Sequence, residues 1–352
     1  MTVRRLKEAP RPVNLALQGG GAHGAFTWGI LDKLLEDGRL SIAGVSGTSA
    51  GAMNAVALAA GYNRDGPEGA RAALEGFWRG MSRHARYSPL QRTAFDVLMG
   101  RWGLEANPMY HAFDALTRMA SPYQLNPMNM NPLRELVEET VDFKNVRACT
   151  AFKLFISATN VETGKVRVFP REALTVDMVM ASACLPHLYQ AVEIDGVPYW
   201  DGGYMGNPAL FPFYGTTGSD DIVVIQINPI ERKGTPRTAF EIENRLREIS
   251  FNGSLLKELR AIDFVDRLIR EGKLSTDSYR QVRVHIIENE AEMKPLGASS
   301  KMNPEWAFLC HLRDMGRRTA DRWLDTTSSA VGERSTVDLR TMFSVIGPEH
   351  QG

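Results

Sequence analysis

Apolar residues follow two alternating patterns in the first part of the chain. A short apolar run at residues 13–17 ends at three consecutive glycines, and apolar positions then recur at helical spacing over residues 24–37. A second apolar run at 42–46 meets another glycine-containing turn, and the apolar helix after it is expected to end at Gly61. Strand, glycine turn and helix thus occur twice in succession. Repetition of this unit predicts a largely parallel sheet with helices on both faces.

The same patterns extend this prediction along most of the chain. Residues 62–132 carry large apolar side chains among glycines and prolines, and we expect them to form helices over the sheet. Strand-like runs occupy 154–161, 166–169, 197–200, 221–227 and 281–287, with helical spacing at 176–185, 240–272 (one long helix or a pair) and, last, 304–324. The predicted fold class is α/β, a three-layer sandwich with a mainly parallel central sheet and a C-terminal helical extension.

Domain boundaries are placed where these patterns change. We expect a main domain over residues 13–230 and a mainly helical extension over 231–326 that packs on the same domain. Residues 1–12 and 327–352 lack an apolar pattern and are expected to be flexible tails.

Charge and cysteine content narrow the classes of function. The 352 residues include 41 Lys and Arg against 41 Asp and Glu, so the formal net charge is zero. A protein that binds nucleic acid by releasing counterions normally has a basic excess, so neutrality argues against nucleic acid as the main partner. Cys149, Cys184 and Cys310 are widely spaced, which favours reduced thiols over disulfides or a zinc site.

Targeting signals are not apparent in the sequence. The first residues are basic but lack the apolar stretch of a signal peptide, and nowhere do about eighteen apolar residues follow one another. We therefore expect a cytoplasmic protein.

Two chemistries compete for the first glycine turn, GGGAHG at residues 19–24. Its spacing matches G-x-G-x-x-G between a strand and a helix, which is typical of dinucleotide-binding sites. Such a site also needs an acidic residue at the end of the second strand, but that strand ends in Val45-Ser46, and Asp37 falls in the turn that ends the helix. The alternative is an oxyanion hole, in which glycine N–H groups approach a developing negative charge at a helix N-terminus.

A candidate nucleophile follows at the second turn. Residues 47–51, GTSAG, place Ser49 in a G-x-S-x-G motif between a predicted strand and a predicted helix. Small neighbours on such a tight turn keep the serine hydroxyl exposed for attack on a carbonyl carbon. The motif also occurs by chance at helix starts, but here another glycine turn leads to the same sheet edge.

The serine needs a base, and two candidates lie downstream. No histidine stands in a turn that marks it as catalytic, and His187 is the hardest of them to dismiss. Asp201 directly follows a predicted strand and precedes Gly202-Gly203, which permit a sharp turn. A carboxylate held against the serine hydroxyl can act as general base if partial burial raises its pKa.

Together these motifs resemble the patatin-like phospholipase family. In order they are GGGAHG at 19–24, GTSAG at 47–51, ASACLP at 181–186, DGG at 201–203 and then Asn207-Pro208. The resemblance covers roughly residues 13–230, and it implies a serine–aspartate dyad that works without histidine. The part after residue 230 resembles an extension found in a bacterial subset of the family, and no residue roles are carried over to it.

The resemblance also implies a role for individual residues. Ser49 is the implied nucleophile and Asp201 the implied base, while Gly20, Gly21 and Ala22 belong to the implied oxyanion loop. His23 stands where the family often has arginine or lysine, and its implied role is loop shape or a modest positive charge. The glycines that support these turns are Gly19, Gly24, Gly47, Gly51, Gly202 and Gly203.

The implied activity is hydrolysis of a lipid or long-chain ester through an acyl-enzyme, with neither metal nor organic cofactor. A thioesterase or polyester depolymerase would use the same dyad, and a non-catalytic interaction module could keep the fold. The thioethers and aromatic rings of residues 77–130 could line an acyl channel, contact a membrane surface transiently or form ordinary core. With zero net charge, apolar contact is the favoured route to a lipid, and the sequence does not determine the oligomeric state.

Overall fold

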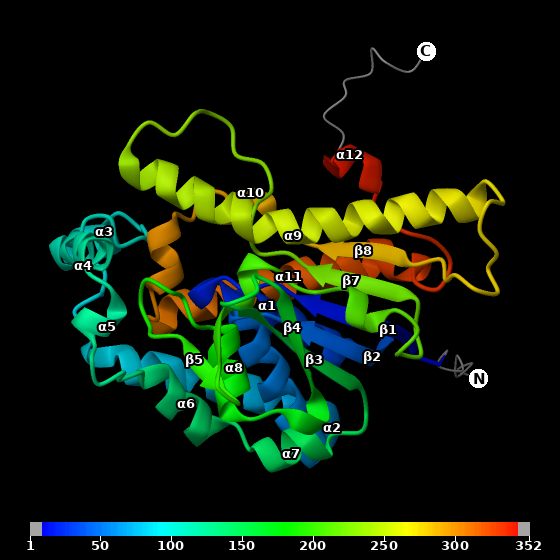
Figure 1. The fold of residues 1–352 in the computed structure, drawn as a ribbon, viewed down its shortest axis with the longest axis horizontal. Helices are drawn as coiled ribbons and strands as arrows, with labels where there is room; N and C mark the ends of the chain where they lie inside the picture. Colours follow the sequence, from blue (N-terminus) through cyan, green and yellow to red (C-terminus); the bar gives the residue numbers. More distant parts are fainter. Residues whose placement is uncertain (1–8, 344–352) are drawn as a thin grey trace, which may run out of the picture.

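An eight-stranded sheet forms the centre of the molecule (Figure 1). The computed structural model describes residues 9–343. The strands are β1 (Arg11–Leu17), β2 (Leu40–Gly47), β3 (Lys153–Asn160), β4 (Val166–Pro170), β5 (Val192–Ile194), β6 (Val197–Asp201), β7 (Asp221–Ile225) and β8 (Arg283–Ile287). Their order is β5-β6-β3-β2-β1-β7-β8, with β4 paired to β3. The strands from β3 to β8 in this order are parallel, and β4, β5 and β6 pair antiparallel.

Helices cover both faces of the sheet, which confirms the predicted three-layer sandwich. They are α1 (Gly24–Asp37), α2 (Ala50–His84), α3 (Ala94–Leu98), α4 (Pro108–Met119), α5 (Pro122–Leu125), α6 (Pro132–Thr140), α7 (Phe143–Ala148), α8 (Val176–Ser182), α9 (Ala239–Arg270), α10 (Glu290–Met293), α11 (Trp306–Thr327) and α12 (Leu339–Phe343). None of these helices, within residues 9–343, is both long enough and apolar enough to cross a bilayer.

Alternation along the strands divides the core between the two faces. Leu15 and Leu17 of β1 face a large cluster that α1, α2, α8 and α11 complete. Ala16 of β1 and Val224 of β7 face a smaller cluster completed by α9 and α12, which lie at the top of Figure 1. The period of two that marks each strand in the sequence therefore sorts its side chains between the two helical layers.

The expected end of the second helix at Gly61 is wrong. Helix α2 continues past this residue and breaks only at Asp65 and Gly66, whose backbone angles are not helical. Gly61 has a packing role instead, because a Cβ there would lie 2.3 Å from the carbonyl oxygen of Gly69 beyond the kink. Residues 239–270 form one helix rather than two, and β5, only three residues long, escaped prediction.

The expectation that both ends of the chain are flexible tails is wrong for the residues that the structure describes. Arg11 begins β1, and the chain after α11 packs against β8. His285 of β8 lies between Asp221 and Thr336, at 3.0 Å from a side-chain oxygen of each, and the N–H of Thr336 donates to the carbonyl of Val284. Leu339 is buried in the smaller cluster. The remaining parts of those tails, residues 1–8 and 344–352, lie outside the described residues.

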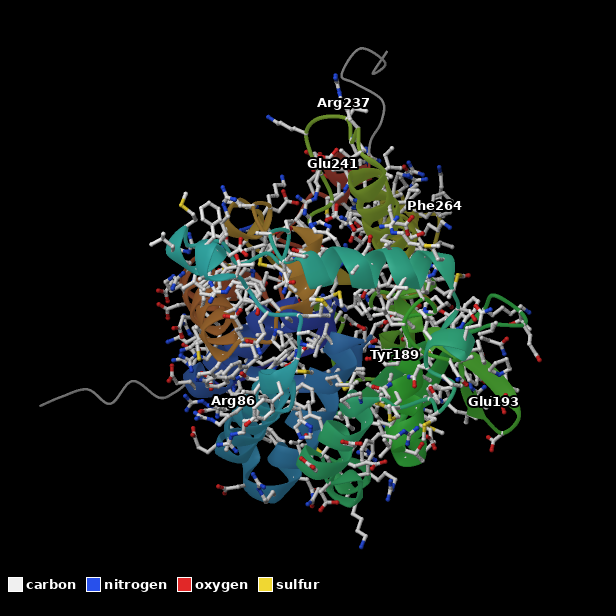
Figure 2. The ribbon with its side chains drawn as sticks, turned by 90° about the vertical axis from the view of Figure 1, so that its left-hand side faces the viewer. Arg86, Tyr189, Glu193, Arg237, Glu241 and Phe264 are labelled. Atoms are coloured by element: carbon white, nitrogen blue, oxygen red, sulfur yellow. The ribbon has the colours of Figure 1, made fainter. Side chains whose placement is uncertain are left out.

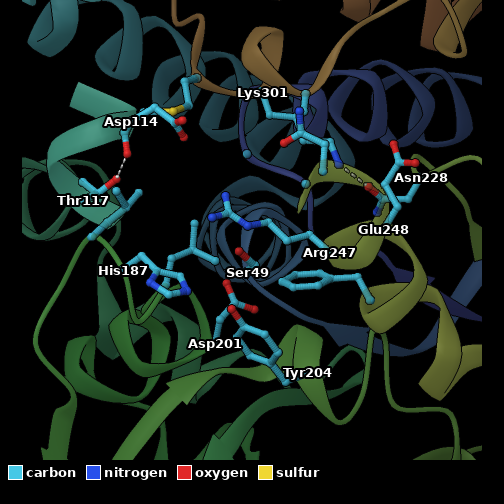
Figure 3. Close-up of a pocket in the computed structure, with 18 of the residues that line it drawn as sticks. Ser49, Asp114, Thr117, His187, Asp201, Tyr204, Asn228, Arg247, Glu248 and Lys301 are labelled. Atoms are coloured by element: carbon cyan, nitrogen blue, oxygen red, sulfur yellow. Dashed lines mark hydrogen bonds between the residues drawn. The ribbon is translucent and has the colours of Figure 1, made fainter. Parts of the chain in front are cut away.

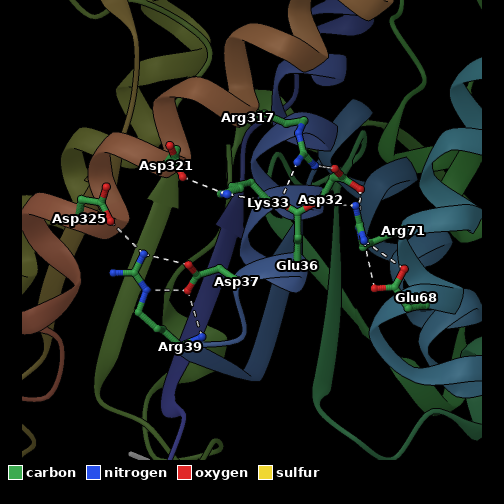
Figure 4. Close-up of polar contacts among 10 residues, drawn as sticks. All are labelled: Asp32, Lys33, Glu36, Asp37, Arg39, Glu68, Arg71, Arg317, Asp321 and Asp325. Atoms are coloured by element: carbon green, nitrogen blue, oxygen red, sulfur yellow. Dashed lines mark hydrogen bonds and ion pairs between the residues drawn. The ribbon is translucent and has the colours of Figure 1, made fainter. Parts of the chain in front are cut away.

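Helix α11 fastens the C-terminal region to α1. The two backbones nearly touch, because a Cβ at Gly29 would lie 1.9 Å from the carbonyl oxygen of Arg313, and one at Gly316 2.1 Å from that of Phe26. An ion-pair network among α1, α2 and α11 surrounds this crossing (Figure 4). These pairs are partly accessible to solvent and each contributes little, so the close glycine contact and the buried apolar side chains mainly hold α11 in place. The C-terminal region thereby packs on the helix that begins at the first glycine turn.

Candidate active site

Ser49 lies on the sharp turn between β2 and α2. Its backbone has φ 55° and ψ −121°, a conformation that is costly for any residue other than glycine. Two glycines make the turn possible, since a Cβ at Gly47 would lie 2.5 Å from the carbonyl oxygen of Gly51, and one at Gly51 2.2 Å from that of Leu17. The predicted strand–serine–helix context is present, with Ser49 held in a strained turn at the sheet edge.

Distant segments hold this turn by hydrogen bonds. The N–H of Ser49 donates to Ser182 Oγ at 2.9 Å, and Thr48 Oγ1 donates to the carbonyl of Gly206 at 2.6 Å. Sequence reasoning found the ASACLP block that contains Ser182 but gave this serine no role. The position of Ser182 next to Ser49 depends on tertiary contact, which no local sequence pattern indicates.

The first glycine turn packs directly against Ser49. A Cβ at Gly19 would lie 2.7 Å from the Cβ of Ser49, and Gly20 and Gly21 line the same cavity as Ser49. Gly21 has φ 60°, and a Cβ there would lie 2.5 Å from the carbonyl oxygen of Lys301. Because the first N–H groups of a helix lack partners within it, this turn can present them to an oxyanion beside Ser49.

Asp201 lies at the end of β6 and is completely buried. Its Oδ1 accepts a hydrogen bond from the N–H of Gly203 at 2.7 Å, while Oδ2 has no partner of normal hydrogen-bond geometry among the described residues. The Ser49 hydroxyl lies beside this carboxylate at one end of the cavity and is close enough to stabilise its charged form (Figure 3). The turn requires glycine at 202, where a Cβ would lie 2.1 Å from the carbonyl oxygen of Ser157.

Burial makes the Asp201 carboxylate unusually basic. Desolvation raises its pKa to about 7, although the Gly203 N–H and the Ser49 hydroxyl act in the opposite direction. A pKa near the working pH leaves a large fraction of the carboxylate ionised while keeping its affinity for a proton high. This combination suits a general base at neutral pH.

His23 does not supply the modest positive charge expected of it. It is buried, with its Nε2 2.7 Å from Ser300 Oγ. Burial is the main cause, and the nearby Lys301 ammonium a further one, of a pKa well below the usual histidine value, so the ring is neutral at pH 7. The expectation of charge is therefore wrong. The contact with Ser300 joins the glycine turn to residues 298–302, which agrees with a role in loop shape.

His187, the other candidate base, and Asp37, the candidate acid of a dinucleotide site, lie in less suitable positions. His187 lines the cavity, but it is exposed and makes no hydrogen bond with any described residue. Asp37 forms an ion pair with Arg39 at 2.7 Å (Figure 4). It lies at the far end of the 14-residue α1, about 20 Å from the first glycine turn. Asp37 cannot reach a ligand bound at that turn, which removes the support for dinucleotide binding.

Ser49 and Asp201 open into a cavity of about 180 Å³ (Figure 3). Its sheet-edge wall consists of the first glycine turn, the Ser49 turn and the Asp201 turn. Its helical wall consists of α4, the N-terminal half of α9 and residues 298–302. Apolar side chains contribute much of the lining, among them Phe113, Leu185, Leu188, Phe251 and Met302. The motifs in the sequence predicted the sheet-edge wall. The sequence also predicted a helix over residues 240–272, but neither this helix nor residues 298–302 carry a motif that would place them at the site.

The methionine- and aromatic-rich segment 77–130 is divided between core, cavity and surface. Phe77 and Trp78 are core, and Tyr110 is buried beside the cavity. Most of the others are exposed: Tyr87, Phe95, Met99, Met109, Met119, Tyr123, Met128 and Met130. Helix α4, drawn in teal, crosses this face of the molecule in Figure 2. An exposed apolar surface thus lies on the helix that lines the cavity with its other side.

Known proteins provide a comparison for this arrangement. Among solved structures, VipD from Legionella pneumophila is 14% identical with a TM-score of 0.40, the match covering 91% of this chain and 67% of VipD. ExoU in its complex with SpcU from Pseudomonas aeruginosa is 14% identical with a TM-score of 0.37, covering 90% of this chain and 52% of that one. The chain therefore spans about half the length of ExoU. Structural similarity with TM-scores this low does not support an inference about activity.

The family comparison is more decisive. A search of curated proteins by sequence gives no match. The family model described as patatin-like phospholipase matches residues 15–214, more than half of the chain and the whole segment that holds Ser49 and Asp201. The chain belongs to the patatin-like phospholipase family.

Proposed function

We propose that the protein is a serine lipid acyl hydrolase of phospholipase A or esterase type, with Ser49 and Asp201 as its catalytic dyad. One observation carries this proposal: the buried Asp201 carboxylate, with a pKa of about 7, keeps Oδ2 unpaired in the cavity that it shares with Ser49. Family membership supports lipid esters as the substrate class.

The reaction proceeds in two acyl-transfer steps. Asp201 Oδ2 takes the proton of the Ser49 hydroxyl as Oγ attacks the ester carbonyl, and the same proton is then given to the leaving alcohol. Water attacks the acyl-enzyme in the second step, with Asp201 again as the base. The fixed hydrogen bond from Gly203 keeps the carboxylate oriented throughout.

The N–H groups of Gly20, Gly21 and Ala22 stabilise the tetrahedral oxyanion in this scheme. Their turn contacts Ser49 and leads into α1, whose N-terminal end carries partial positive charge. We also propose that residues 13–230 form the catalytic domain. In this division residues 231–326 complete the cavity through α9 and residues 298–302.

Lipid is reached, in this proposal, by transient apolar contact with a membrane surface. Two helices of the cavity wall have exposed apolar stripes: Met109, Leu116 and Met119 on α4, and Ile242, Leu246 and Ile249 on α9. The members of each stripe are spaced so that they share one helix face. A bilayer touching this surface would lie beside the cavity, so an acyl chain could enter without crossing water.

A fluorophosphonate probe tests the proposal directly. The folded protein is expected to be labelled at Ser49 and to lose labelling in Ser49→Ala, as read by mass spectrometry of the peptide that contains residue 49. A series of p-nitrophenyl esters then tests the substrate class, with rates expected to rise as the acyl chain lengthens. Absence of labelling in folded protein would favour a non-catalytic module, and rates that fall beyond two-carbon chains would contradict a lipid substrate.

A further inference from the structure

We propose that Lys301 and Arg247 form an anion subsite beside Ser49, which selects esters that carry a phosphate group close to the scissile bond. This inference rests on the proposed function of the same cavity and names a determinant of its substrate choice. Both side chains line the cavity, and both belong to the region after residue 230.

Lys301 is placed next to the first glycine turn. Its carbonyl oxygen packs against Gly21, and its Nζ donates to Asn228 Oδ1 at 2.8 Å. Asn228 in turn donates to the carbonyl of Gly19 at 2.7 Å, which ties the lysine to the turn that faces the oxyanion. Among the residues that the structure describes, Lys301 forms no ion pair with a carboxylate. Its ammonium group therefore lies in the cavity wall with only a neutral amide oxygen as partner.

Arg247 extends from α9 into the cavity above Ser49 (Figure 3). Its Nε donates to Glu243 Oε1 at 3.0 Å, and within residues 9–343 its two Nη groups make no hydrogen bond. Its charge acts on Lys301 and on Tyr204, so the two cations and the catalytic end of the cavity lie within electrostatic range. A guanidinium with free Nη groups is well shaped to bind two phosphate oxygens at once.

The other charged side chains of the cavity wall are already neutralised. Asp114 pairs with Arg118 at 2.8 Å, and Glu248 pairs with Arg232 at 2.7 Å. Neither of these arginines lines the cavity. Glu243 pairs with Arg247, and the one Glu248 carboxylate, whose charge also acts on Lys301, is shared by Arg232 and Arg245. Among the described residues around this part of the cavity, cations therefore outnumber carboxylates, although the whole protein is neutral.

Partial burial gives the Lys301 charge a cost that an anion would relieve, whereas Arg247 keeps 46% of its side chain exposed and can turn its Nη groups toward a ligand. Desolvation lowers the pKa of Lys301 to about 8, opposed by the charge of Glu248 and assisted by the neighbouring arginines, which still leaves the ammonium largely protonated at pH 7. A partly buried cation without an ion-pair contact is unfavourable, and a bound phosphate supplies that contact. The apolar lining around Phe113, Leu188 and Phe251 suits an acyl chain, so the fitting ligand is amphiphilic: an ester lipid with a phosphodiester.

Two soluble substrates with the same acyl chains provide the kinetic test. Dihexanoylphosphatidylglycerol carries the phosphodiester and dihexanoylglycerol lacks it, and both are used as monomers. We expect Lys301→Met and Arg247→Gln each to lower the ratio of kcat/KM for the phospholipid to that for the neutral lipid by about tenfold or more. Lys301→Arg, which keeps the charge, should recover most of this ratio. Arg270→Gln removes an arginine with a similar i,i+4 ion pair at the other end of α9 and should leave the ratio unchanged.

A binding experiment tests the anion subsite independently of the proposed hydrolase activity. Ser49→Ala protein is titrated calorimetrically with dihexanoylphosphatidylglycerol, dihexanoylglycerol and inorganic phosphate, so that no turnover is required. Phospholipid binding that Lys301→Met weakens about tenfold, with little change for the neutral lipid, would support the subsite even if no ester were hydrolysed. Equal losses for both lipids would overturn it, because Lys301 would then only shape the glycine turn. Inorganic phosphate that binds as tightly as the phospholipid would also overturn it, as the site would then serve free phosphate.

Discussion

The two walls of the cavity are built in different ways. In the sheet-edge wall, backbone atoms fix the reacting groups, and a Cβ added at Gly51 or Gly202 would lie within 2.2 Å of a neighbouring carbonyl oxygen. In the helical wall, side chains from α4 and α9 line the cavity, and Gly253 of α9 has no atom within 4 Å of such a Cβ. The proposed catalytic residues thus lie on the wall where the backbone leaves no room for larger residues, and the proposed substrate subsite lies on the wall that can accept substitutions.

The largest expected effect is loss of turnover from the sheet-edge wall. Ser49→Ala and Asp201→Asn should each reduce kcat on a p-nitrophenyl ester by about 10³-fold or more, because the dyad acts as a unit. Thermal unfolding of each variant checks that the fold is intact. Asparagine at 201 can still accept the hydrogen bond from Gly203, so a folded but inactive protein is expected. If Asp201→Asn stayed active while His187→Ala did not, the dyad would be wrong.

A pair of glycine substitutions compares the walls by stability. Gly51→Ala should lower the free energy of unfolding by about 3 kcal/mol, since the new methyl group would overlap the carbonyl of Leu17. Gly253→Ala should raise it by about 0.5–1 kcal/mol, because alanine has the better helix propensity and meets no atom there. Urea denaturation measures both. Equal effects would mean that the two walls do not differ in rigidity.

Because the pKa of Asp201 is raised, activity should increase with pH whereas stability should decrease. Because its pKa is about 7, kcat/KM for a neutral ester should fall about tenfold per unit below that pH as the base becomes protonated. Folding raises this pKa, so the folded state binds more protons than the unfolded state between about pH 4 and 7, and stability falls as pH rises through that window. The Asp201→Asn variant should therefore unfold at a higher temperature than the wild type at pH 8. A lower unfolding temperature for this variant would contradict the burial of a charged carboxylate.

The smallest expected effect concerns the exposed side of the helical wall. Leu116→Gln and Met119→Gln on α4 should each weaken binding to phosphatidylcholine vesicles by about threefold, as a partly inserted apolar side chain is lost. Phe264→Gln on α9, labelled in Figure 2, removes another half-exposed apolar residue and serves as the control. Vesicle sedimentation measures the binding. Equal losses for all three variants would show that no particular face meets the lipid.

The local sequence pattern was sufficient to predict those elements whose conformation depends on nearby residues. The turns at Ser49 and Asp201 could be recognised in the sequence because each is flanked by glycines. A larger residue at these glycines would clash with neighbouring atoms. Strand and helix positions followed from periods of two and of about 3.6 residues. The errors arose where distant contacts decide: Gly61 is kept within its helix by packing on Gly69, and residues 328–343 are ordered by β8 rather than by their own composition.

The sequence by itself determined the fold class and the order of the motifs, because periodicity and turn residues are local features, and through the family resemblance it predicted the pair Ser49 and Asp201. Only the tertiary structure decided the protonation of the pair and the shape of the substrate site. Burial, a property of the whole fold, raises the pKa of Asp201 and keeps His23 neutral. Arg247 and Lys301 reach the cavity from about 200 and about 250 residues beyond Ser49, separations across which no local residue pattern can specify a contact.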